Sequence, residues 1–61
     1  MYTIRFLAPN ESAPREVVAA EETATVQVVS ALHLTGCNVW VTACGLDLTE
    51  GFMKAVRERQ G

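Results

Sequence analysis

Four side chains that can bind a metal ion or take part in nucleophilic catalysis lie in the second half of the chain: His33, Cys37, Cys44 and Asp47. Zinc takes such ligands, and a cysteine activated by a histidine is a nucleophile. Zinc-binding cysteines usually sit close together on a turn, whereas Cys37 and Cys44 are separated by a predicted strand and fall on its opposite faces. We therefore predict no metal, no cofactor and no catalytic residue, and we expect that the chain is not an enzyme.

The same spacing excludes a disulfide. An extended stretch of this length spans roughly 23 Å, far beyond the ~7 Å between Cα atoms that a disulfide tolerates. Two free thiols with no signal peptide before them indicate a reducing compartment. No apolar run approaches the ~18 residues of a membrane span. These features predict a cytoplasmic protein.

The chain has 5 basic and 7 acidic residues, with a formal net charge of −2. Binding of nucleic acid usually requires a basic stripe that neutralises phosphates. Lys54, Arg57 and Arg59 come closest to one, although Glu58 interrupts it. Nucleic-acid binding through these three residues is therefore the alternative function, and it predicts an affinity that falls steeply with added salt.

With 61 residues, of which 49% are hydrophobic and 20% charged, the chain is expected to form a single small globular domain, 1–61. At this size, apolar burial and conformational entropy nearly cancel, so small domains usually need a disulfide, a metal or another subunit. Since the first two are not expected, self-association is the remaining support. A homo-oligomer, most simply a dimer, is predicted.

Three segments are expected to be strands, and two of them, 2–8 and 38–43, show the alternation of strands. Residues 2–8 and 15–20 flank a polar turn with two prolines, and they are expected to pair as a hairpin. Residues 38–43 form the third strand. A final helix is expected from about Leu48 to Arg59. Asp47 just before it and Glu50 in its first turn have the spacing of a capping box.

Residues 21–35 fit either a strand or a helix. Gly36 favours the helix, because glycine is the common residue just beyond a helix C-terminus and a strand begins directly after it. A helix is therefore predicted from about Thr23 to Leu34, with Thr23 or Thr25 as its N-cap.

The resulting element order is β-β-α-β-α. It predicts an α+β fold, a two-layer sandwich in which a three-stranded, mainly antiparallel sheet in the order 2-1-3 carries two helices on one face.

The other face of this sheet is then open to solvent and carries the only tryptophan. Trp40 is expected there with Arg5 and Leu7. Because Trp and Arg dominate the energetics of protein interfaces, this group is expected to bind a partner. The full set predicted to contact a partner is Thr3, Arg5, Leu7, Asn38, Trp40 and Thr42. Two alternatives remain open for the indole: burial under the C-terminal helix, or stacking on a ligand.

These features predict a small protein–protein interaction or regulatory module, of the kind that phages and accessory genes encode. It would bind itself or another protein through the open face around Trp40. Pairing of the second or third strand with another copy across a twofold axis is a second route to association.

Overall fold

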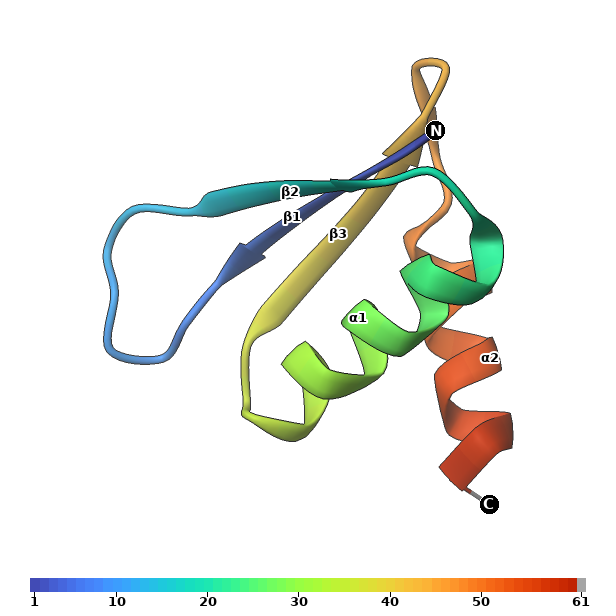
Figure 1. The fold of residues 1–61 in the computed structure, drawn as a ribbon. Helices are drawn as coiled ribbons and strands as arrows, with labels where there is room; N and C mark the ends of the chain where they lie inside the picture. Colours follow the sequence, from blue (N-terminus) through green and yellow to red (C-terminus); the bar gives the residue numbers. More distant parts are fainter. Residues whose placement is uncertain (61) are drawn as a thin grey trace.

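The computed structural model describes residues 1–60, with side chains through Arg59. Its elements follow in the order β1 (Tyr2–Leu7), β2 (Arg15–Ala19), α1 (Glu22–Leu34), β3 (Asn38–Ala43), β4 (Leu46–Asp47) and α2 (Thr49–Gln60). Figure 1 shows the strands as one layer and the two helices as the other. The predicted α+β class and two-layer arrangement are confirmed. No helix in the described part of the chain has the length and apolar character needed to cross a bilayer.

The sheet has the order β2-β1-β3-β4, and each neighbouring pair is antiparallel. The predicted order 2-1-3 is therefore correct but incomplete. Placing β1 in the centre lets β2 and β3 run in the same direction without touching, as the helical crossover between them requires.

The fourth strand was missed because it is only two residues long. The chain reverses through Cys44 and Gly45, which have φ of 53° and 76°, and Ala43 pairs with Leu46. Two consecutive residues with positive φ form the type I′ turn that suits the twist of a two-residue hairpin. Gly45 thus turns the chain back into the sheet.

The C-terminal end of α1 follows the prediction. Gly36 has φ of 85°, its N–H donates to the carbonyl of His33 (3.0 Å), and the N–H of Cys37 donates to that of Leu32 (3.1 Å). This pair of bonds is the Schellman motif, which satisfies carbonyls at the helix end. The segment is therefore a helix, and β3 starts where the motif releases the chain.

The start of α1 differs from the prediction. Glu21, with extended φ and ψ, is the N-cap, and it makes no side-chain capping bond. Thr25, one of the two predicted caps, is buried instead, and its hydroxyl donates to the carbonyl of Glu21 at 2.8 Å. Thr23 lies inside the first turn.

α2 begins at Thr49, within one residue of the predicted start, but the predicted capping box does not form. Asp47 Oδ1 accepts the N–H of Thr49 (3.0 Å) and its hydroxyl (2.7 Å). The Thr49 hydroxyl in turn accepts the N–H of Val41 (2.9 Å), and the N–H of Leu48 donates to the carbonyl of Val41 (2.8 Å). The N-terminus of α2 is thereby joined to the outer edge of β3.

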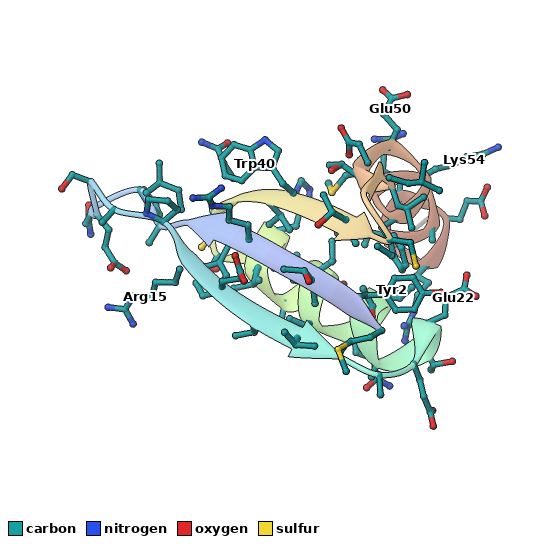
Figure 2. All side chains as sticks on the ribbon, turned by 90° about the horizontal axis from the view of Figure 1, so that it is seen from above. Tyr2, Arg15, Glu22, Trp40, Glu50 and Lys54 are labelled. Atoms are coloured by element: carbon teal, nitrogen blue, oxygen red, sulfur yellow. The ribbon has the colours of Figure 1, made fainter. Side chains whose placement is uncertain are left out.

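The core lies between the sheet and the helices. Ile4, Val29, Val41 and Val56 are fully buried and Phe52 is nearly so. The ring of Tyr2 meets that of Phe52 edge-on at 5.3 Å. Figure 2 shows α1 behind the sheet and α2 beside β3, so both helices cover the face that carries Ile4 and Val41.

Candidate protein interaction surface

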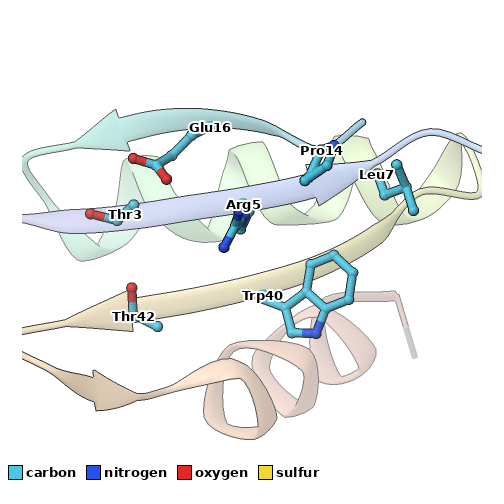
Figure 3. Close-up of a pocket in the computed structure, with 7 residues that line it drawn as sticks. All are labelled: Thr3, Arg5, Leu7, Pro14, Glu16, Trp40 and Thr42. Atoms are coloured by element: carbon cyan, nitrogen blue, oxygen red, sulfur yellow. The ribbon is translucent and has the colours of Figure 1, made fainter. Parts of the chain in front are cut away.

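The sheet face opposite the helices is built from cross-strand rows. Arg5 stands in the middle of the central row, directly opposite Glu16 of β2 on one side and Trp40 of β3 on the other. Residues in direct register lie on the same face of a sheet, so these three side chains share the open face, as Figure 3 shows. The next row places Thr3 between Val18 and Thr42.

Trp40 is not covered by α2. It is 43% exposed, while Val41, the next residue, is fully buried. The period of two along β3 sends Val41 to the core and Trp40 to the open face. Within one chain, the alternative of a tryptophan buried under the C-terminal helix is therefore wrong.

A shallow depression of about 440 Å³ runs over this face. Trp40 and Leu7 lie toward one end of it, and Arg5 lies at its centre (Figure 3). Five of the six residues predicted to contact a partner line it: Thr3, Arg5, Leu7, Trp40 and Thr42. Asn38, opposite Leu7 at the start of β3, is exposed but outside the lining. That these residues contact a partner stays a prediction.

Three surface residues from the β2 side were not predicted. Pro14 and Glu16 line the depression, and Val18, opposite Thr3, is 56% exposed. The hairpin loop between β1 and β2 is too long for its turn type to set the register, so the sequence offered no means of assigning these residues to a face. Alternation within the second strand gave no signal either, because Val17 and Val18 are both apolar.

The centre of the open face has no net charge. Arg5 and Glu16 are opposite in charge and directly across from each other, although no ion pair within 4.0 Å joins them. The one such ion pair in the described side chains joins Arg15 to Glu11 at 3.0 Å, where the loop enters β2. Both guanidinium and carboxylate at the centre of the face are thus available to a partner.

His33 and the two cysteines do not form a site. His33 is exposed in the last turn of α1, Cys37 is half-buried, and Cys44 is exposed at the hairpin turn. Cys44 occupies the turn and not the strand. Both thiols are free, and the described residues contain no group of three side chains placed to hold a metal ion.

The three basic residues of α2 do not share one side of the helix. At about 100° per residue, Lys54 and Arg57 lie within about 60° of each other, whereas Arg59 is turned about 140° from Lys54. Glu50 projects beside Lys54 from the outer surface of α2 (Figure 2). Arg59 instead lines a groove with Glu22 of α1. This distribution lacks the basic stripe on which the nucleic-acid alternative depends.

No family model, no curated protein and no solved structure matches this chain.

Proposed function

We propose that this chain is a small protein–protein interaction module with a regulatory role, and that its open face binds the open face of a second copy. The observation that carries the proposal is the exposed indole of Trp40 on a face that neither helix covers. Leu7 and Pro14 add apolar surface beside it. Interface cores favour tryptophan and arginine in just such a setting.

The expected energy is modest. A tryptophan side chain has roughly 200 Å² of surface, so burial of the exposed 43% of Trp40 removes roughly 90 Å² from water. At about 25 cal/mol per Å², this contributes about 2 kcal/mol. Each copy supplies one tryptophan to a twofold interface, so two indoles take part in the same contact.

Charge supports a second copy as the occupant. The chain carries a net charge of −2, but Arg5 and Glu16 cancel at the centre of the open face. Two identical faces therefore do not repel each other there. A twofold axis can place Arg5 of each copy against Glu16 of the other, which satisfies both groups.

The size of the face indicates a dissociable complex. Three strands up to about 20 Å long and the two-residue β4, all about 4.8 Å apart, give a footprint of roughly 300 Å², against about 800 Å² per partner in a standard stable interface. Association is therefore expected to be reversible on dilution.

The emission of Trp40 tests the proposal, because it is the only tryptophan. We expect blue, quencher-protected emission at high protein concentration that shifts to the red on dilution. Emission that stays red and quenchable throughout would exclude self-association through the open face and indicate another protein as the occupant of that face.

Substitution gives the second test. Trp40→Ser should lower the average mass in sedimentation equilibrium while the circular dichroism spectrum stays that of the wild type. The control is Leu34→Ser, which removes another exposed apolar side chain, 71% exposed, from the end of α1; its mass should equal the wild-type mass. A Trp40→Ser variant that associates as the wild type does would exclude the open face.

A further inference from the structure

The two edges of the sheet differ in their state. At one edge, β4 pairs with the end of β3, and Leu48 and Thr49 bind the carbonyl and the N–H of Val41. At the other edge, β2 (Arg15–Ala19) pairs only with β1. Figure 1 shows no helix or loop lying along the outer side of β2. Of the two edges proposed from the sequence for pairing, that of β2 is open along its whole length, whereas that of β3 is occupied from Val41 to Ala43.

The direction of the backbone groups of β2 follows from the register. Val41 turns its N–H and C=O away from β1, toward Leu48 and Thr49. Its opposite residue Ile4 therefore turns its own groups toward β2, where Val17 stands opposite it. Alternation along β2 then directs the N–H and C=O of Glu16 and Val18 outward, to the open edge.

The side chains of this edge are apolar on both faces. Val17 is 39% exposed on the helix side, and Val18 is 56% exposed on the open face. Charged residues stand only at the first two positions of the strand, Arg15 and Glu16. Natural edge strands are usually protected by charged side chains, an inner proline, a bulge or a covering element. In β2 the charges are confined to Arg15 and Glu16, and from Val17 to Ala19 the strand has none of these protections.

We propose that β2 pairs in antiparallel register with β2 of a second copy, about a twofold axis that passes through Val17. Val17 is the midpoint of the five-residue strand, so this register pairs every residue of β2. Val17 meets Val17 of the second copy, Glu16 meets Val18, and Arg15 meets Ala19. The Glu16–Val18 pairs exchange the outward N–H and C=O groups in both directions.

The pattern of β2 suits a copy of itself as the occupant. No like charges stand directly opposite in this register, and each Glu16 keeps Arg5 of its own chain across from it. The valines meet at the axis on the helix side, where α1 covers mainly β1 and β3. Pro14 has no N–H and ends the new ladder beyond Arg15.

Edge pairing also enlarges the open face. Two four-stranded sheets join into one of eight strands with all helices on one side and both Trp40 grooves on the other. The shared footprint is roughly 600 Å², twice that of one copy and nearer to the ~800 Å² of a standard interface. The edge axis runs perpendicular to the sheet and a face-to-face axis runs parallel to it, so both contacts are compatible in a closed dimer of dimers.

The test compares substitutions at Val17, which points away from the open face. Val17→Lys places two ammonium groups opposite each other at the axis, whereas Val17→Thr retains a β-branched side chain and the pairing. We expect the mass of the lysine variant in sedimentation equilibrium to fall to half of the wild-type mass or below, and that of the threonine variant to stay unchanged. A lysine variant that keeps the wild-type mass overturns the proposal, as does a wild type that is monomeric at every concentration.

Val18→Pro provides a second variant if the lysine variant does not fold. Proline removes only an outward N–H at this position, so the ladder to β1 remains, and proline is tolerated on edge strands in this orientation. Loss of mass with retained circular dichroism supports the edge; unchanged mass overturns it. The edge inference does not depend on the open-face proposal: Trp40→Ser with unchanged mass would exclude the open face alone.

Discussion

Trp40 and Val41 are neighbours in β3 with opposite environments. Val41 is fully buried against Ile4 and the helices, and Trp40 is exposed on the other side of the same strand. The difference follows from the pleat of the strand, and it turns a single aromatic residue into the centre of the open face. Local geometry therefore explains why the indole is exposed, and only the partner that covers the open face is a matter of proposal.

The carboxyl group of Asp47 has a lowered pKa. The hydroxyl and the N–H of Thr49 donate to its carboxylate and hold the pKa below the ordinary aspartate value. Both bonds are made to the charged form, which they stabilise. The carboxylate thus secures the residue whose hydroxyl binds the backbone of β3, and charge on Asp47 supports the joint between α2 and the sheet.

The pH dependence of stability tests this role. Because the folded-state pKa is depressed, the contribution of Asp47 is complete above the unfolded-state value of about 3.9 and is lost as the pH falls through the folded value. We expect the urea midpoint to fall over this range more steeply in the wild type than in Asp47→Asn, which does not titrate. Glu50→Gln, a neighbouring exposed acid, is the control and should keep the steep wild-type slope. Parallel curves for wild type and Asp47→Asn would contradict this role.

Among the elements, the two helices contain glycine in opposite circumstances. Gly36 follows α1 with φ of 85°, a conformation that costs other residues energy. Gly51 lies inside the first turns of α2, and no heavy atom stands within 4 Å of an added Cβ there. One glycine is required by the backbone, and the other weakens its helix.

Alanine at these two positions should therefore have opposite effects. Gly36→Ala should reduce the free energy of unfolding by about 1 kcal/mol through strain at positive φ. Gly51→Ala should raise it by about 0.5–1 kcal/mol, because alanine is the better helix former. In thermal unfolding followed by circular dichroism, each change should shift Tm by several degrees. Equal signs at the two sites would contradict the assignment of Gly36 to the helix C-terminus.

How far the sequence predicted these elements depended on whether a local signal existed. Alternation and Gly36 were sufficient for the strands, for α1 and for the order 2-1-3. The β3–β4 hairpin was not predicted, because two residues cannot display a period. The bond from the N–H of Val41 to the hydroxyl of Thr49 is a tertiary contact, and no local pattern indicates it. The β3 side of the open face was predicted because that strand alternates. The β2 side, with Glu16 and Val18, was not, because the long loop before β2 leaves the register of that strand unspecified.

The whole molecule is a thin slab with extents of 29 × 27 × 16 Å. Within residues 1–59, five hydrophobic residues are buried, and they form one layer of side chains between sheet and helices. The accessible surface of 4234 Å² somewhat exceeds the ~3,900 Å² expected for a compact monomer of this size. A chain with so little interior gains more than a larger protein does from covering its open face and its edge.

Stability should therefore depend on protein concentration. Association favours the folded chain by mass action, because the unfolded chain does not form either interface. We expect the Tm of the wild type, measured by circular dichroism, to rise with protein concentration, and the rise to be smaller in Trp40→Ser and in Val17→Lys. The double variant should lose it, since both proposed contacts are then absent, while Leu34→Ser should retain it. A wild-type Tm independent of concentration would mean that the small core alone maintains the fold. Such a result would contradict both proposed interfaces, because each of them requires a second copy.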